Sequence, residues 1–466
     1  MLTPSFNITQ NDEHLFIKIH APYTQLKEVE INVLESVFWF YSSPYFLRLH
    51  FPCAIVDNDE PPASFDSDKG EFEVQLKKVQ AGEVFPDLDL LGTLLAPKRT
   101  QQNIKPTIEV VSGLSSENTG DNEAEEEDED EDEWLFDQIL PQNEQVTLLQ
   151  NSSKYGFGNL TSGVFQQVKS EFKEIIDLPE PDGILASQRE ELKIKDESNR
   201  FCPDHYLADF MEPEVIEEYM SYTPPWCTET TDTVKLSHKE KDCLKKLGNK
   251  EFLLSREDKT GVWLSLVDIV FAYAYNHRTT LGENNVESAW TINKLSATLS
   301  WFANFSSLHG VTVSCIRRSL TFPLYRNWDL AKLVLKDTIS IFKLGRRRVL
   351  KCLVEVHSMF AASEPRYLLN QLYINDYCIW LQRASETKLA KFTKALEEIT
   401  VSKNDIGFDL EELEQAALLV QEEEEFLTEK MNKIQIQSEE SSTSSDSDTS
   451  SGESTLDSDD DSSPES

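Results

Sequence analysis

The sequence predicts a multidomain protein, β then α, with an antiparallel β-sandwich over residues 1–95 and an all-α helical domain over residues 151–400. Two observations predict this order. Short apolar runs in the first part alternate with polar residues, which is typical of half-buried strands. From about residue 155 the apolar residues recur at helical spacing instead. A strongly acidic segment, the third observation, separates the two parts.

The predicted strands of the first part are short, and turn residues separate them. Residues 6–8 and 15–19 flank a turn at residues 11–13 and form a first hairpin. Further strands are predicted at residues 29–33, 38–41, 45–51 and 71–76. Several short strands at this spacing, with no helical period between them, favour a sandwich.

Residues 96–150 form a predicted linker. Residues 121–133 carry eleven acidic side chains in thirteen positions, and an apolar run, residues 134–140, begins at once with Trp134. The linker as a whole buries too little apolar surface to offset the entropy of ordering, so we predict that it is disordered. The sequence leaves open whether residues 134–140 dock in a groove of a partner or pack on the chain's own helical domain.

The helical domain begins near residue 151. A short helix is predicted to end at Gly248, and the nearly all-apolar residues 262–275 predict a buried helix. Further helices are predicted at residues 289–308, 330–342, 349–360 and 367–381. Residues 401–437 predict a charged helix, and residues 438–466, which contain no Lys or Arg, predict a disordered acidic tail.

The net charge of −39 is unevenly distributed. Residues 1–100 carry −7, residues 101–200 carry −16, residues 201–400 carry +1 and residues 401–466 carry −17. A surface this acidic repels nucleic acid and anionic lipid, and it attracts basic molecules. We therefore expect a basic protein partner, no direct nucleic-acid binding and no membrane association.

The seven cysteines are scattered and form no CxxC pair, and the chain opens without an apolar leader segment. This pattern predicts free thiols in a reducing compartment, either cytosolic or nuclear. The longest apolar run, residues 262–275, is interrupted by Asp268 and is too short to span a bilayer.

No motif predicts catalysis, a cofactor or a metal. Gly156 and Gly158 form a GxG pair, but neither a phosphate loop nor a dinucleotide fingerprint follows. Cys202 and His205 have the spacing of metal ligands, but a structural zinc site needs four ligands and no second pair lies nearby. We therefore expect neither a cofactor nor an enzyme.

The basic run GRRR, residues 345–348, stands out in so acidic a chain. The favoured interpretation is a helix start whose arginines pair with acidic segments or cover apolar surface. A nuclear-import signal or a phosphate contact is the alternative.

The tail contains acceptor sites for an acid-directed kinase, each three residues before an acidic residue: Ser445, Ser450, Ser454 and Ser458. Each phosphate would add about −1.5 to −2 charges at neutral pH. Phosphorylation would therefore deepen the existing charge.

Five stretches, residues 3–10, 155–159, 324–331, 345–353 and 376–382, together resemble the SHQ family of assembly chaperones for box H/ACA ribonucleoproteins. The opening TPSFNITQ, residues 3–10, followed by the predicted sandwich, resembles a CS domain, which has the alpha-crystallin-like fold. The matching stretches of the SHQ-specific domain are YGFGN (155–159), LYRNWDLA (324–331), GRRRVLKCL (345–353) and DYCIWLQ (376–382). The resemblance covers both predicted domains, so most of the chain except the linker and the tail.

The resemblance implies a chaperone that binds the free dyskerin-type pseudouridine synthase before guide RNA arrives. It would occupy the RNA-binding face, prevent aggregation or premature RNA binding, and leave with the help of RuvB-like ATPases. We expect a monomer in the nucleus (nucleoplasm) and the cytoplasm. The residues that we expect at the interaction surface are Phe6, Gln10, Tyr155, Phe157, Arg326, Trp328, Arg346 and Arg347. A structural role is the favoured reading of Trp328.

A strict RNA mimic would carry its acid on the helical domain, yet residues 201–400 are nearly neutral. Either a local patch exists, or the mimicry is mainly steric. Such a patch would consist of Glu212, Glu214, Glu217 and Glu218, for which a solvated helix face is the simplest interpretation.

Two functions of other classes compete with this one. A co-chaperone of the large heat-shock ATPase would require binding by residues 1–95 alone. An enzyme would require a pocket with converging titratable groups, and no motif suggests one.

Overall fold

The computed structural model describes residues 2–95 without residues 23, 25–28, 59–60 and 68, together with residues 153–165 and 172–442. Side chains are described as far as residue 432. The chain divides into two compact units, Met1–Phe408 and Asp409–Ser466. The acidic run (residues 121–133), the apolar run (residues 134–140) and the four tail serines Ser445, Ser450, Ser454 and Ser458 lie outside the described residues. What the sequence predicts for them stays a prediction.

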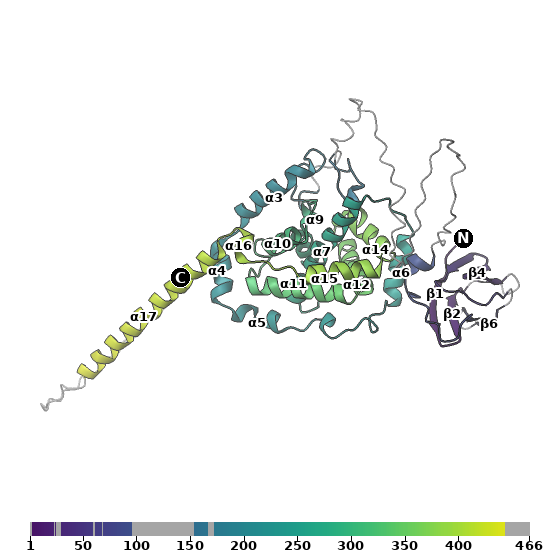
Figure 1. Cartoon of the computed structure of the whole chain (residues 1–466). Coiled ribbons are helices and arrows are strands. Elements are labelled where there is room, and N and C mark those ends of the chain that lie inside the picture. Colours follow the sequence, from purple (N-terminus) through teal and green to yellow (C-terminus); the bar gives the residue numbers. More distant parts are fainter. Residues whose placement is uncertain are drawn as a thin grey trace, which may run out of the picture. The chain divides into compact units, whose positions relative to one another are not determined.

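The N-terminal part consists of two antiparallel sheets, which confirms the predicted β-sandwich (Figure 1). One sheet has the strand order β1-β2-β7-β6 and the other has the order β3-β4-β5. The strands are β1 (Ser5–Gln10), β2 (His14–His20), β3 (Glu30–Leu34), β4 (Val37–Ser42), β5 (Tyr45–His50), β6 (Ala63–Asp66) and β7 (Glu71–Lys77). Strand β6 was not predicted because its sequence, ASFD, is too short to show alternation.

The alternating apolar side chains that the sequence predicts fill the space between the two sheets. Leu15, Ile17 and Ile19 of β2 are fully buried, whereas the side chains between them are more exposed. Phe40 of β4 meets Phe72 of β7 with ring centroids 5.1 Å apart, so aromatic side chains join the sheets. Each such side chain contributes roughly 1.5–3 kcal/mol when it is buried, and a register slip by one residue would expose it.

The second part is helical, as predicted, and it is built around α7 (Figure 1). The helices are α1 (Leu91–Leu94), η2 (Phe157–Asn159), α3 (Ala186–Arg200), α4 (Pro203–Met211), α5 (Glu214–Ser221), η3 (Pro225–Cys227), α6 (His238–Leu247), α7 (Arg256–Thr279), α8 (Ser288–Leu295), α9 (Ala297–Ser300), α10 (Leu308–Ser319), α11 (Trp328–Lys343), α12 (Arg346–Ala361), α13 (Tyr367–Leu369), the π-helical η4 (Asn370–Ile374), α14 (Asn375–Leu381), α15 (Glu386–Glu397) and α16 (Lys403–Ile406). Helix α7 is buried without interruption from Leu264 to Arg278, as its nearly all-apolar sequence predicts. It packs against α8, α10, α11 and α12.

The prediction of a single helix over residues 289–308 is wrong. The chain forms α8 and α9 instead, with Ser296 in an extended conformation between them. The Asp268 carboxylate on α7 accepts hydrogen bonds from the Ser296 hydroxyl at 2.5 Å and from the Thr298 amide at 2.8 Å. A buried carboxylate requires such donors, so this tertiary contact overrides the local helical period.

A buried ion pair joins α7 to α11. Arg278 Nε lies 2.6 Å from Asp337 Oδ2, and both side chains are almost fully buried. The indole of Trp226 donates to the other oxygen of Asp337 at 3.0 Å. Arg278 also donates to the carbonyls of Tyr219 and Tyr222, at 2.7 and 2.9 Å. Every strong hydrogen-bonding group of the pair is thus satisfied, which a buried pair needs in order to be tolerated.

The described part of the second unit is helix α17 (Leu410–Ser442). It is highly charged, as predicted, and it continues past the predicted end at residue 437. The domain boundaries derived from the sequence stay predictions. Within the described residues no helix is long and apolar enough to cross a bilayer.

Asp337→Ala should lower the free energy of unfolding by about 3–5 kcal/mol, because the Arg278 charge would stay buried without its carboxylate. Urea unfolding of the full chain, followed by circular dichroism at 222 nm, measures this change. Asp329→Ala is the matched control, since Asp329 lies in the exposed first turn of the same helix. It should cost only about 0.3–1 kcal/mol. Equal losses in the two variants would contradict the importance of the buried pair.

Burial lowers the pKa of His277 below its usual value of 6.5, so the folded protein keeps this imidazole neutral. The unfolded chain therefore takes up the proton first as the pH falls. The stability contributed by neutral His277 is complete above about pH 6.5 and is lost as the pH falls from there toward the folded-state pKa. His277→Gln should make the free energy of unfolding depend less on pH between about pH 7 and 5. His238→Gln, a variant at an exposed position, should keep the pH dependence of the wild type.

Candidate functional site

Gln10, one of the predicted site residues, anchors the segment that follows the last strand of the sandwich. Its amide nitrogen donates to the Phe85 carbonyl at 2.9 Å, and its oxygen accepts from the Phe85 amide at 2.9 Å. The same oxygen accepts from Lys78 Nζ at 2.9 Å. Because both ends of the side chain are used, Gln10 fixes the position of residues 83–85, which lead to Asp87 and Asp89.

These two aspartates meet the basic run at the start of α12. Arg347 Nε donates to both carboxylate oxygens of Asp89, at 2.9 and 3.0 Å, and a terminal nitrogen of Arg347 donates to Asp87 at 2.8 Å. Arg346 forms an ion pair with Asp87 and donates to the carbonyls of Gln382 and Ala384. Although burial disfavours the charged guanidinium, Asp89 and Asp87 raise the pKa of Arg347 above its usual value. The favoured interpretation of residues 345–348, a helix start with paired arginines, is confirmed.

Further contacts complete the junction, by which we mean the contact of β1 and residues 83–92 of the sandwich part with α6, the start of α12 and the end of α14. The Gly92 amide donates to Gln382 Oε1 at 2.8 Å. A side chain at Gly92 would lie 3.0 Å from Gln382 Cβ, so the close approach favours glycine. Lys241 Nζ on α6 donates to Asn7 Oδ1 on β1 at 3.1 Å. A groove of about 710 Å³ lies beside these contacts, between β1 and residues 231–241.

The other predicted site residues support the fold from within. Phe6 packs on the sandwich core, and Phe157 is buried against Phe252, Tyr377 and Trp380. The Tyr155 hydroxyl donates to Asp182 at 2.7 Å, and burial raises the pKa of Tyr155. The structure therefore brings Gln10, Arg346 and Arg347 together and leaves Phe6, Tyr155, Phe157, Arg326 and Trp328 elsewhere. Their contact with a partner stays a prediction.

The first helices of the helical domain are strongly acidic. Residues 201–234 contain eight carboxylates and no Lys or Arg, which leaves +9 for residues 235–400. Five of the carboxylates are exposed on α4, α5 and the turn between them, and we call them the acidic face: Asp204, Glu212, Glu214, Glu217 and Glu218. The sequence alone identified four of them. Glu214 and Glu217 lie in the first turn of α5, where negative charge also stabilises the helix.

Apolar and aromatic side chains lie beside the acidic face. Val215 is 50% exposed, and Leu324 on the adjoining loop is 69% exposed. The hydroxyl oxygens of Tyr219 and Tyr325 are 2.9 Å apart, and their rings are 4.7 Å apart. The hydrogen bond with Tyr219 raises the pKa of Tyr325 to about 12. The arrangement combines negative charge with apolar anchors, as protein interfaces do.

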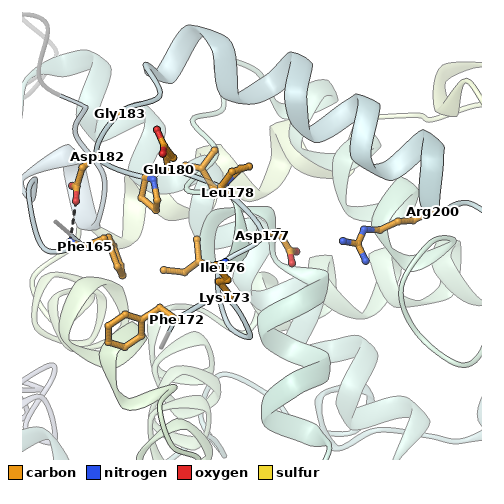
Figure 2. Close-up of a pocket in the computed structure, with 12 residues that line it drawn as sticks. Phe165, Phe172, Lys173, Ile176, Asp177, Leu178, Glu180, Asp182, Gly183 and Arg200 are labelled. Carbon is orange, nitrogen blue, oxygen red and sulfur yellow. Dashed lines mark hydrogen bonds between the residues drawn. The ribbon is translucent and has the colours of Figure 1, made fainter. Parts of the chain in front are cut away.

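His205, one of the two residues with metal-like spacing, lies at the same place. Its Nε2 is 2.7 Å from the Leu324 carbonyl oxygen and 3.8 Å from Asp209. No cluster of three or more His, Cys, Asp or Glu side chains arranged to hold a metal occurs in the described ranges. A separate pocket of about 660 Å³ lies near Phe172 and Asp177 (Figure 2).

Comparison with known proteins identifies both parts of the chain. Residues 3–95 match the family model described as SHQ1-like, CS domain, and residues 225–410 match the model described as SHQ1 protein, Shq1 domain. Protein SHQ1 homolog of Xenopus tropicalis is 41% identical over 435 residues, which are 91% of this chain and 71% of the relative. The chain belongs to the SHQ1 family. Protein SHQ1 homolog of Mus musculus is 40% identical over 442 residues (91% and 76%), and protein shq1 of Schizosaccharomyces pombe is 35% identical over 447 residues (91% and 99%).

Membership of the SHQ1 family supports a chaperone role in the assembly of H/ACA ribonucleoproteins and, more generally, a protein-binding function. The SHQ1 family is not known for enzymes. Its CS model ends at Leu95, just after α1, and its Shq1-domain model begins at Pro225, where η3 begins. Helices α3 to α5, with the acidic face, precede the second match.

The sequence did not identify Asp87, Asp89, Gln382 or Lys241 as parts of the junction. Asp89 and Arg347 are 258 positions apart, and nothing local reports that separation. Two features of the sequence could have indicated the junction. A run of three arginines needs acidic partners, and Asp87 and Asp89 flank Leu88 in an otherwise apolar segment.

Arg347→Ala and Asp89→Ala, made singly and together, should show a coupling energy of about 0.5–3 kcal/mol, because the two side chains form one half-buried, doubly hydrogen-bonded pair. Urea unfolding of the four full-length proteins measures it. The cycle of Lys343→Ala with Glu397→Ala is the control, since this pair is half exposed and should couple by less than about 1 kcal/mol. Additive effects at Arg347 and Asp89 would contradict a junction held by this pair.

Proposed function

We propose that the chain is an assembly chaperone that binds the free dyskerin-type pseudouridine synthase. It occupies the RNA-binding face of the enzyme and prevents aggregation or premature RNA binding during box H/ACA ribonucleoprotein assembly. The single observation that carries this proposal is the acidic face beside Val215 and Leu324. Membership of the SHQ1 family supports the assembly role in general.

Complementary charge favours a partner of this kind. A protein surface that binds RNA presents Lys and Arg to phosphates, and it attracts any other surface that presents ordered anions. The five carboxylates of the acidic face are exposed and lie within residues 201–234, which contain no Lys or Arg. Repulsion between them is relieved when a basic surface approaches. The acidic face therefore supports an electrostatic contribution to binding, in addition to steric blocking of the RNA-binding face.

Apolar contacts add to this attraction. Rim charges mainly set the association rate and the choice of partner, whereas buried apolar side chains supply most of the binding free energy. Val215, Leu324 and the tyrosine pair offer such anchors within the charged surround. A partner with a basic rim and an apolar centre fits this surface best.

The remaining parts of the proposal rest on the family resemblance, except phosphorylation of the tail, which rests on the serine pattern of the sequence. RuvB-like ATPases drive release of the synthase, the chaperone works as a monomer in the nucleoplasm and the cytoplasm, and phosphorylation of the tail deepens its charge.

Neutralising three residues of the acidic face, with Glu214→Gln, Glu217→Gln and Glu218→Gln combined, should weaken binding to the purified synthase about tenfold. Each exposed charge pair contributes about 0.2–1 kcal/mol, and tenfold corresponds to about 1.4 kcal/mol. Calorimetry with the full chain measures the affinity at low and high salt, with and without H/ACA guide RNA. The variant should also bind with a weaker salt dependence, and guide RNA should displace the wild type.

The matched control neutralises three exposed glutamates of α17, with Glu422→Gln, Glu423→Gln and Glu424→Gln combined. It changes the net charge equally and should keep near wild-type affinity. Circular dichroism checks that both variants fold. Equal loss in both variants would mean that only net charge matters, and binding that guide RNA leaves unchanged would rule out the RNA-binding face as the contact.

A further inference from the structure

The pocket shown in Figure 2 lies in the helical domain, apart from the acidic face and the junction. It has a volume of about 660 Å³, within the range of about 300–1,000 Å³ that is usual for ligand sites. Its lining residues are Phe165, Phe172, Lys173, residues 176–183 and Arg200. Figure 2 shows Phe165, Phe172 and Ile176 gathered at one end and Asp177 and Arg200 at the other.

The acidic side chains of this pocket are already engaged within the domain. Asp177 accepts from Lys294 Nζ at 2.6 Å. Asp182 accepts from the Tyr155 hydroxyl at 2.7 Å and from the amide of Gly163 at 2.7 Å. A cation would have to compete with these donors. The apolar end, in contrast, offers the partly exposed ring of Phe172 beside the buried side chains of Phe165 and Ile176. An aromatic or aliphatic ligand therefore suits the pocket better than an ion does.

We propose that the apolar run of this chain, residues 134–140 (WLFDQIL), occupies this pocket. The run supplies five large apolar side chains, Trp134, Leu135, Phe136, Ile139 and Leu140, directly after the acidic run. Large aromatic and aliphatic side chains remove much apolar surface from water when they enter such a site, and this burial favours binding. Asp137 and the preceding acids are opposite in charge to Lys173, which is exposed at the pocket.

The path of the chain makes this intramolecular contact short. The described chain resumes at Ser153, whose hydroxyl donates to the carbonyls of Pro181 and Ile184, at 2.6 and 2.8 Å. Pro181 lines the pocket, so the linker reaches the helical domain at the rim of the site. From Leu140 to Ser153 a flexible chain spans about 20 Å on average and at most about 45 Å. A ligand tethered at this range has a high effective concentration at the pocket.

Occupation of the pocket has a consequence for the acidic run, residues 121–133. These residues directly precede Trp134, so the eleven carboxylates would be held against the helical domain and not only tethered to it. The inference does not depend on the identity of the partner.

Hydrogen exchange of the full chain tests the proposal. In the combined variant Trp134→Ala, Leu135→Ala and Phe136→Ala, amides in residues 172–184 should exchange at least about tenfold faster than in the wild type. The control variant Leu148→Ala with Leu149→Ala removes apolar side chains from the same linker outside the run, and it should leave this exchange unchanged. A synthetic peptide of residues 128–142 should bind the triple variant and should bind the wild type at least about tenfold more weakly.

Unchanged exchange in residues 172–184 of the triple variant overturns the proposal, whether or not that variant binds the synthase less well. Protection that disappears on dilution also overturns it, because the occupant would then belong to a second copy of the chain. Faster exchange throughout the helical domain would signal general destabilisation and would likewise contradict a local contact.

Discussion

An arginine keeps its charge inside a protein, so each buried guanidinium must be surrounded by carboxylates or carbonyls. This constraint organises the helical domain. Arg278 holds α7 to α11 through Asp337, and Arg318 on α10 meets Glu197 on α3 at 3.0 Å. Arg346 extends the same principle to the sandwich through Asp87. In each case the partner comes from a distant part of the sequence, so a few paired charges determine which helices and which domain lie together.

The division between predicted and unpredicted features follows from this constraint. Six of the seven strands and the long helices could be predicted because alternation and helical period are local properties of the sequence. Strand β6 is too short to show a period, and the break at Ser296 depends on Asp268 from another helix. The junction could not be predicted for the same reason: its acidic half lies in residues 83–92, and its basic half follows more than two hundred positions later.

Internal pairing also explains the charge of the molecule's surfaces. Residues 235–400 are positively charged as a whole, but Arg278, Arg318, Arg346 and Arg347 are all used inside the fold or at the junction. Asp209 of α4 accepts a hydrogen bond from the Arg326 amide, but the five acids of the acidic face lie exposed to solvent. A domain that is nearly neutral in sum therefore still presents one distinctly negative region. Local composition along 34 residues describes that region better than the total over two hundred does.

The absence of Lys and Arg from residues 201–234 has a chemical consequence as well. Trypsin cuts only after these two residue types, so it can release the acidic face only as one long fragment, between Arg200 and Lys235. Enzymes that acetylate lysine or attach ubiquitin to it find no acceptor amine there. Whatever lysine-directed signals regulate or degrade this protein must therefore act from other surfaces, and they can do so while α4 and α5 are covered by a partner.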